Sequence, residues 1–400
     1  MTKKSDTPAI RFKGFTDTWE QRKLCDVVKE ITRNDPESEA PIMMITANNG
    51  FIEQSERYAF NNAGESLKKY ILLKKGELAY NHGASKLRPY GSCFALTTAE
   101  NARIPFVYHC FSAENQNAEF MSIELNGAEI ENQLRKIVSS GARMDGLLNI
   151  SFDEYTSVSV LLPSTEEQDC IADFFRQLDN LITLHQRKYD KLTNVKKSML
   201  EKMFPKNGSN VPEIRFKGFT EAWEQRKLSE IADKVTEKNA GLQYVETFTN
   251  SAEFGIISQR DFFDHDIAKL GSLDGYYIVK NEDFVYNPRI STSAPVGPIN
   301  RNKLGRTGVM SPLYTVFRPH DVDTTYLEHF FKCAYWHSFM NFNGDSGARS
   351  DRFSIKDDVF FQMPIPLPYI DEQRKIGELL TRLDHLITLH QRKRLSSIQT

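Results

Sequence analysis

The stretch that decides the fold is IRFKGFT at residues 10–16, because it returns unchanged at residues 214–220, 204 positions later (214 − 10). Two further blocks repeat at nearly the same offset: WEQRKL at 19–24 and 223–228, and LITLHQRK at 181–188 and 386–393. A period of half the chain indicates a domain duplication, since solenoid repeats run about 20–50 residues. The stretches between the blocks have diverged. The pattern therefore predicts a constant scaffold, formed by the repeated blocks, that carries a different variable region in each half.

The totals place the chain among soluble globular proteins of two domains, with 400 residues, 40% hydrophobic and 26% charged. No apolar run approaches the roughly 20 residues of a membrane span, and no apolar core follows Lys3 and Lys4, so we expect neither membrane nor signal peptide. The five cysteines lack Cys-x-x-Cys spacing, which favours reduced thiols in a cytoplasm over disulfides or zinc. The net charge of −2 predicts modest DNA binding without partners.

Each half begins with apolar residues at helical spacing, which predicts an amphipathic helix of two to three turns; the alternative is a loop. These residues are Leu24, Val27, Val28 and Ile31, and in the second copy Leu228, Ile231, Ala232 and Val235. A variable block follows, roughly 25–160 and 229–365, in which short apolar runs between turn residues predict strands. The runs are 70–73, 77–80, 276–279, 284–286 and 314–317, and a helical segment is expected at 326–339. The block is therefore expected to be α+β with a twisted or barrel-like sheet.

Each half ends in a long helix. The first is predicted from Thr165 to Met203, about 58 Å at 1.5 Å per residue, and the second starts after Leu367-Pro368 and runs to Thr400. Apolar residues recur every seven positions along both, which predicts that the helices pair, most simply antiparallel. The pairing positions are Ile171, Phe174, Leu178, Leu181, His185 and Leu192 on the first helix, and Ile376, Leu379, Leu383, Leu386 and His390 on the second. The alternative is that each helix lies on its own block.

With these blocks in place, the chain resembles the DNA-specificity (S, HsdS) subunit of type I restriction–modification systems along nearly all of its length. The motifs that carry the resemblance are Phe-x-Gly-Phe, the Trp-to-Leu block and Leu-Pro…Glu-Gln…Ile…Leu-Asp at 162–179 and 367–384. The resemblance implies two α/β target-recognition domains separated by two long antiparallel coiled-coil helices in a pseudo-twofold repeat. The implied segments are 1–162 and 206–366 for the recognition domains, and 163–205 and 367–400 for the helices.

The resemblance also implies a function. Each domain would read one half of a bipartite, asymmetric site in double-stranded DNA, while the helices set the spacing and dock two modification (methyltransferase) subunits. Restriction subunits with ATPase and nuclease activity would join them. The chain itself would be non-catalytic and bind no cofactor, with S-adenosylmethionine, ATP and Mg²⁺ held by the partner subunits. The alternatives are a self-contained DNA adenine methyltransferase and a duplicated coiled-coil protein adaptor.

The motifs of catalysis are missing from the sequence. The nearest match to the methyltransferase tetrapeptide Asn-Pro-Pro-Tyr is NPRI at 287–290, which lacks the second proline and the aromatic residue. No phosphate-binding Gly-x4-Gly-Lys-Ser/Thr loop is present, and none of the nine histidines is paired at metal-ligand spacing. These observations favour a binding subunit with no metal site.

Candidate DNA contacts are polar and basic residues in loops, because Arg and Lys suit guanine while Asn and Gln suit adenine. They are Asn81, His82, Ser85, Lys86 and Arg88 in the first block, and Asn287, Arg289, Ser291 and Thr292 in the second. The alternative is that the shared Tyr-Asn pair is a structural turn. Arg143 and Arg349, in a second shared loop, would contact phosphate or be buried beside an aspartate. The basic run Arg301, Lys303 and Arg306 would follow the DNA backbone or form a solvated face.

Overall fold

The computed structural model describes residues 8–47, 49–58, 64–138, 147–206, 209–263, 270–345 and 351–399. The chain divides into a first unit, Met1–Asn180, and a second unit, Leu181–Thr400, with the boundary inside one long helix. Among the described residues, no helix is both long enough and apolar enough to span a bilayer.

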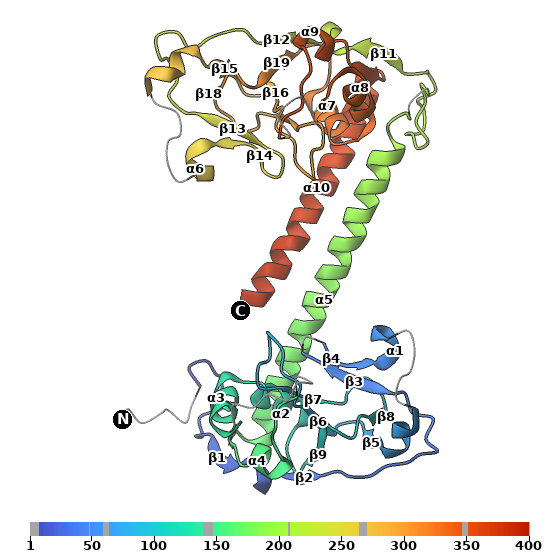
Figure 1. Ribbon diagram of the computed structural model, residues 1–400, viewed down its shortest axis with the longest axis vertical. Helices are drawn as coiled ribbons and strands as arrows, with labels where there is room; N and C mark the ends of the chain where they lie inside the picture. The colour runs from blue at the N-terminus through green and yellow to red at the C-terminus, as the bar shows by residue number, and fades with distance from the viewer. Residues whose placement is uncertain are drawn as a thin grey trace. The chain divides into compact units, whose positions relative to one another are not determined.

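Within its described residues, the first unit contains ten short strands and a set of helices (Figure 1). The strands are β1 (Glu20–Lys23), β2 (Val28–Glu30), β3 (Met43–Thr46), β4 (Gly50–Glu53), β5 (Ile71–Lys74), β6 (Leu78–Asn81), β7 (Ser92–Ala95), β8 (Asn101–Ile104), β9 (His109–Ala113) and β10 (Ser159–Leu162). The helices are α1 (Gln54–Arg57), α2 (Ala118–Leu125), α3 (Ala128–Ile137), α4 (Phe152–Thr156) and α5 (Thr165–Lys202), which continues into the second unit.

The second unit repeats this order element by element. Its strands are β11 (Glu224–Lys227), β12 (Ala232–Lys234), β13 (Phe248–Ser251), β14 (Gly255–Ser258), β15 (Tyr277–Val279), β16 (Phe284–Tyr286), β17 (Ile299–Arg301), β18 (Gly308–Met310), β19 (Thr315–Pro319) and β20 (Pro364–Leu367). Its helices are α6 (Gln259–Phe263), α7 (Thr324–Phe331), α8 (Tyr335–Asn343), α9 (Asp357–Phe360) and α10 (Ile370–Gln399). The expected helix over 326–339 is thus two helices, α7 and α8.

A four-stranded antiparallel sheet lies at the centre of each unit, in the order β2-β9-β6-β7 and β12-β19-β16-β17. Side chains alternate across a strand, so each sheet has two buried faces. In β16, Phe284 and Tyr286 join the core that includes α7, while Val285 joins a smaller core with Phe248 of the β13–β14 hairpin. These sheets and helices confirm the α+β prediction.

The predicted entry helix is wrong in both copies. Residues Leu24–Asp26 form a single 3₁₀ turn, and the next residues form strand β2, which pairs with β9. A 3₁₀ turn followed by a strand buries Leu24, Val27 and Ile31 just as a helix would, because strand alternation also places residues four apart on one face. The copy in the second unit has the same turn, Leu228–Glu230, followed by β12.

The repeated sequence blocks meet in a buried polar junction that both units share. In the first unit, Arg11 donates two hydrogen bonds of 2.7 Å to the carboxylate of Glu167. In the second unit, Arg215 makes the same fork to Glu372, at 2.7 and 2.8 Å. The glutamine after each glutamate also has one role: Gln168 and Gln373 bind the proline carbonyl five residues earlier, and each accepts a backbone N–H from the start of α2 or α7. The IRFKGF motif supplies the arginine of this contact in each unit, and the Leu-Pro…Glu-Gln motif supplies the glutamate that accepts its hydrogen bonds.

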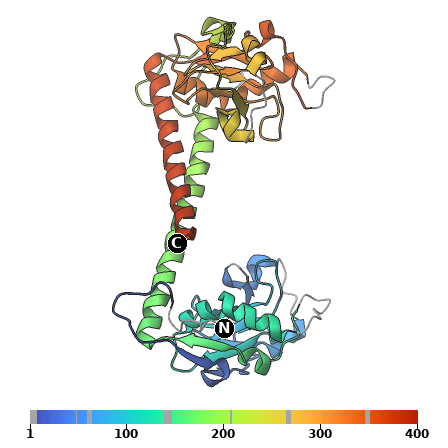
Figure 2. The same cartoon turned by 90° about the vertical axis from the view of Figure 1, so that its left-hand side faces the viewer.

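The C-terminal half of α5 runs antiparallel to α10 within the second unit (Figures 1 and 2). The Nδ1 atoms of His185 and His390 lie 3.0 Å apart, and Lys196 forms an ion pair with Asp384, so the α10 partner number falls as the α5 number rises. Leu192, Val195 and Met199 pack on the core that contains Ile376, Leu380 and Leu383. The first turns of each helix also lie on their own block, since Ala172 belongs to the first-unit core.

In each helix, one set of the predicted pairing positions is shifted by one residue. The half-buried positions of α5 include Leu178, Ile182, His185, Tyr189 and Leu192, while Leu181 is 49% exposed. Along α10 the inner residues are Ile376, Leu380, Leu383, Ile387 and His390, and Leu386 is 39% exposed. Leu379 is half-buried against the core, and Phe174 instead contacts Phe12 edge to face in the first unit. Ile171 packs on the first-unit core.

Candidate nucleic-acid interface

The loop that follows β6 in the first unit and β16 in the second is held by the same three contacts. Tyr80 donates its hydroxyl to the carbonyl of Tyr90 at 2.6 Å, and Tyr286 does so to Val296 at 2.9 Å. The side-chain oxygens of Asn81 and Asn287 each accept the backbone N–H two residues later, at 2.9 Å. Both amide nitrogens donate to the neighbouring hairpin, at Ile45 and Asn250. The Tyr-Asn pair is thus a structural turn, and both asparagine side chains are committed to backbone groups.

A glycine closes each of these loops. Gly91 and Gly297 both have φ of +84°, and a Cβ atom would lie 2.6 Å from the carbonyl oxygen of Asn81 or 2.1 Å from that of Asn287. No side chain fits at such distances, so the ends of the loop are fixed in both units. The residues between the fixed ends differ, which leaves their side chains as the variable content.

In the first unit, most of the candidate side chains in this loop are occupied by contacts within the protein. His82 is buried, with Nδ1 2.8 Å from the carbonyl oxygen of Leu148. The hydroxyl of Ser85 accepts the backbone N–H of Arg88, whose guanidinium donates to the carbonyl of Asn126 at 2.8 Å. Lys86 is exposed, and with the 62% exposed Leu87 it occupies the tip of the loop.

In the second unit, the loop presents its candidates to solvent. Arg289, Ser291 and Thr292 are all exposed. The Ser291 hydroxyl caps a tight turn by accepting the N–H of Ala294 at 3.2 Å. The backbone of Arg289 pairs with Arg352 in an antiparallel bridge, which places two arginines next to each other.

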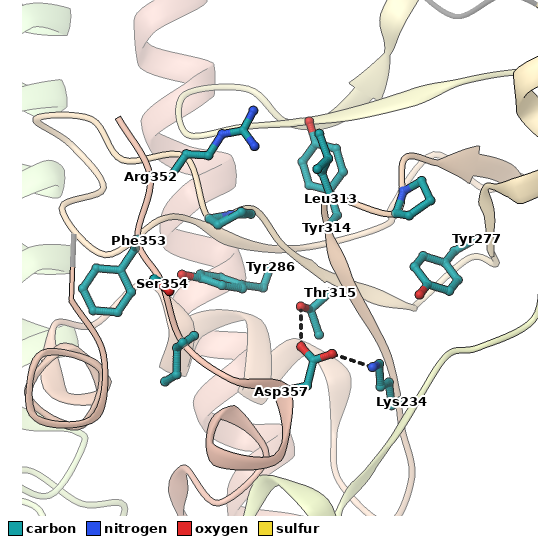
Figure 3. Close-up of a pocket in the computed structure, with 13 residues that line it drawn as sticks. Lys234, Tyr277, Tyr286, Leu313, Tyr314, Thr315, Arg352, Phe353, Ser354 and Asp357 are labelled. Atoms are coloured by element: carbon teal, nitrogen blue, oxygen red, sulfur yellow. Dashed lines mark hydrogen bonds and ion pairs between the residues drawn. The ribbon is translucent and has the colours of Figure 1, made fainter. Parts of the chain in front are cut away.

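Arg352 lines two adjoining depressions of about 470 and 440 Å³, which also share Pro288, Leu313 and Tyr314. Figure 3 shows the second of these, with the Arg352 guanidinium directed toward the side of Leu313 and Tyr314. The carboxylate in this depression, Asp357, is already bound by Lys234 and by the Thr315 hydroxyl at 3.1 Å. Sequence analysis missed Arg352 and Tyr314. A signal was present, since Arg352 directly follows the aspartate that closes the shared Ser-Gly-Ala-Arg-x-Asp segment, where the first copy has glycine.

All three residues of the basic run in the second unit form ion pairs with acids of the same unit, although Lys303 and Arg306 remain about half exposed. Arg301 is only 10% exposed and binds Glu282 and Glu328 at 2.9 and 2.6 Å. Lys303 also binds Glu328, and Arg306 makes a two-pronged contact with Glu246. Burial alone would raise the pKa of Glu328, but Lys332, Lys303 and Arg301 outweigh it and lower that pKa to about 2. Arg143 and Arg349 lie outside the described residues.

Within the described ranges, no group of three or more His, Cys, Asp or Glu side chains is arranged to hold a metal ion. The His185–His390 contact is a packing contact between helices. Burial, and then the neighbouring His185, lowers the pKa of His390 below its ordinary value.

The second half of the chain is similar to a known family of domains. Residues 220–400 match the family model of the "Type I restriction modification DNA specificity domain". A region of 276 residues is 24% identical to the "Type I restriction enzyme MjaVIII specificity subunit" of Methanocaldococcus jannaschii, and covers 64% of this chain but only 62% of that protein.

Two solved structures resemble the whole chain. The HsdS subunit from Thermoanaerobacter tengcongensis is 15% identical with a TM-score of 0.46, covering 95% of this chain and 93% of that one. The type I S subunit from M. genitalium is 11% identical with a TM-score of 0.48, covering 98% and 96%. Both scores are below 0.5, so the fold assignment rests on the sheets and helices of this chain itself.

Proposed function

We propose, on the premise that the chain belongs to the specificity-subunit family of type I restriction–modification systems, that it supplies DNA sequence recognition to such a complex. In this role the chain performs no catalysis. Its partners are double-stranded DNA, two methyltransferase subunits and restriction subunits, and those partners hold S-adenosylmethionine, ATP and Mg²⁺. Neither a self-contained methyltransferase nor a protein adaptor is favoured by the family to which the chain belongs.

The observation that carries this proposal is the contrast between a constant frame and variable loops. The same Tyr-Asn turn and the same closing glycine hold a loop of equal length in both units. Seven of the nine enclosed side chains differ, and the two shared ones are a serine that caps the same turn and a proline. Base readout needs rigidly placed side chains whose identity is free to change, because each base pair offers its own pattern of donors and acceptors. The arrangement fits two readers, each for one half of a bipartite site.

The long helices are proposed to set the gap between the two half-sites. A helix pair is stiff where a flexible linker is not, and readout of a fixed gap requires a fixed spacing. Support comes from the pairing of α5 with α10 through His185–His390 and Lys196–Asp384.

A block exchange tests the proposal. The full chain is expressed with its methyltransferase partner in a host that lacks other restriction systems, and methylated adenines are mapped across the genome. The wild-type map should give one bipartite, asymmetric motif. Replacing residues 25–160 with the block of another family member should change one half of it, and replacing residues 229–365 should change the other. Absence of any motif, or a change in both halves from either exchange, contradicts the proposal.

A further inference from the structure

Two like charges are held directly opposite each other in the second unit. Arg289 and Arg352 face each other in an antiparallel bridge. The hydrogen bonds flank them, from Ile290 N–H to the Asp351 carbonyl at 3.0 Å and from Phe353 N–H to the Pro288 carbonyl at 2.7 Å. This is the narrow, non-hydrogen-bonded type of pair, in which Cα atoms are about 4.5 Å apart and side chains share one face. Like charges at such positions destabilise a strand pair.

No internal carboxylate compensates this repulsion within the described part of the chain. Six arginines of the unit form ion pairs with acids, whereas Arg289 and Arg352 form none within the described residues; the paired ones are Arg215, Arg226, Arg301, Arg306, Arg318 and Arg374. The carboxylate of the nearby depression, Asp357, is bound by Lys234. Two adjacent guanidinium groups without a counter-ion favour a partner that brings hydrogen-bond acceptors.

The two arginines differ in setting. Arg352 is half-buried and lies between the two depressions beside Tyr314 and Leu313, so its planar fork has a limited range of orientations. A held fork matches the O6 and N7 acceptors of guanine, which two parallel N–H groups bind together. Arg289 is exposed at the rim, where a mobile cation suits a phosphate.

The first unit lacks this feature at the same place in its fold. The corresponding bridge joins Gly83 to Leu147, and Leu148 N–H binds the His82 carbonyl at 2.9 Å, just as Phe353 binds Pro288. The backbone arrangement is therefore part of the frame, and the arginine pair is specific to the second unit.

We propose that the second unit reads a guanine in its half of the DNA site through Arg352, while Arg289 binds a neighbouring phosphate. This inference rests on the proposed function. It goes further by naming the base, the residue that reads it and the half-site to which it belongs.

The test uses the full chain in complex with its methyltransferase partner and maps methylated sites for Arg352→Ala, Arg352→Lys and Arg289→Ala. With Arg352→Ala, one G·C position in one half of the motif should become degenerate, with discrimination there falling about 5- to 150-fold. Arg352→Lys should relax the same position, because lysine keeps the charge but loses the fork. Arg289→Ala should leave the motif unchanged and lower the salt dependence of DNA binding by about one unit of slope.

Arg226→Ala is the matched control, since Arg226 lies on β11 outside both depressions and pairs with Glu230. This variant should methylate the same DNA motif as the wild type, at the same rate. A wild-type bipartite motif that survives Arg352→Ala unchanged, or full discrimination by Arg352→Lys, would overturn the guanine assignment and leave the proposed function intact. If Arg352→Ala methylates nothing, the lysine variant decides. A wild-type complex without sequence preference would instead overturn the proposed function itself.

Discussion

The junction between Arg215 and Glu372 can be tested by Arg215→Met, which removes both donors and leaves the carboxylate behind. The Glu372 side chain is fully buried, and the described hydrogen bonds to its carboxylate come from Arg215 at 2.7 and 2.8 Å. These bonds raise the pKa of Arg215 above its ordinary value despite opposing burial, so the guanidinium is charged at neutral pH. Methionine keeps most of the apolar stem and cannot donate.

The expected loss in the free energy of unfolding depends on how the Glu372 carboxylate is accommodated without Arg215. Breaking a buried ion pair by removal of one partner costs about 3–5 kcal/mol. Glu372 lies in the first turn of α10, where the helix dipole stabilises its negative charge by about 0.3–1 kcal/mol. At pH 7 a carboxyl group can also escape by taking up a proton, for about 3.7 kcal/mol, which sets a ceiling. We therefore expect a loss of about 2 to 3.7 kcal/mol at pH 7, and about 1 kcal/mol at pH 5, where protonation of the carboxylate costs less free energy.

The assay is hydrogen exchange of the full chain, followed in peptides from 209–223 and 370–380. Local exchange is preferable to global denaturation because a chain of two units need not unfold in one step. The double variant Arg215→Met/Glu372→Met is the control, since a buried pair replaced by apolar residues recovers most of the stability. A loss below 1 kcal/mol at pH 7, the same loss at pH 5, or a double variant as unstable as the single one would refute the reasoning.

Two further predictions concern the second unit. Gly297→Ala should destabilise it far more than Gly305→Ala in urea unfolding, because both have positive φ but only Gly297 would place a Cβ against backbone, 2.1 Å from the Asn287 oxygen; equal losses would contradict the close approach. Burial, and then Lys332, lowers the pKa of His329 below 6.5, so its contribution to stability is complete above pH 6.5 and is lost as the pH falls through the lowered value. His329→Gln should therefore flatten the fall in melting temperature between pH 7 and 5, and an unchanged slope would count against it.

Local patterns were enough to predict the long elements and several strands. The first helix was expected to start at Thr165, where it does, and it ends at Lys202, one residue before the predicted end. The entry segment could not be resolved in this way, because Leu24, Val27 and Ile31 are buried equally by a helix or by a turn followed by a strand. The pairing position predicted at Leu181 was ambiguous for a similar reason. Leu181 and Ile182 are both apolar, and only the partner helix decides which of the two side chains faces it.

The candidate site was harder to predict, because the use of a charged side chain depends on partners far away in the sequence. Arg301, Lys303 and Arg306 look like one basic run, yet the structure ties them to Glu282, Glu328 and Glu246, from 19 to 60 residues distant. Arg352 was overlooked for the opposite reason: it lies across from Arg289, and no described carboxylate forms an ion pair with it. Neither property is visible in a linear pattern.

The structure also gives a physical reason why LITLHQRK is retained in both copies. His185 and His390 occupy the same position of that block and touch each other, so a local twofold relation connects the two helices at this point. In such an isologous contact the same sequence block lies on both sides of the interface. The surface that it forms must therefore be complementary to itself. A change in one copy meets the unchanged residue of the other, whereas a loop side chain that faces solvent meets no copy of itself. Self-contact therefore constrains the helices, and its absence leaves the loops after β6 and β16 free to diverge.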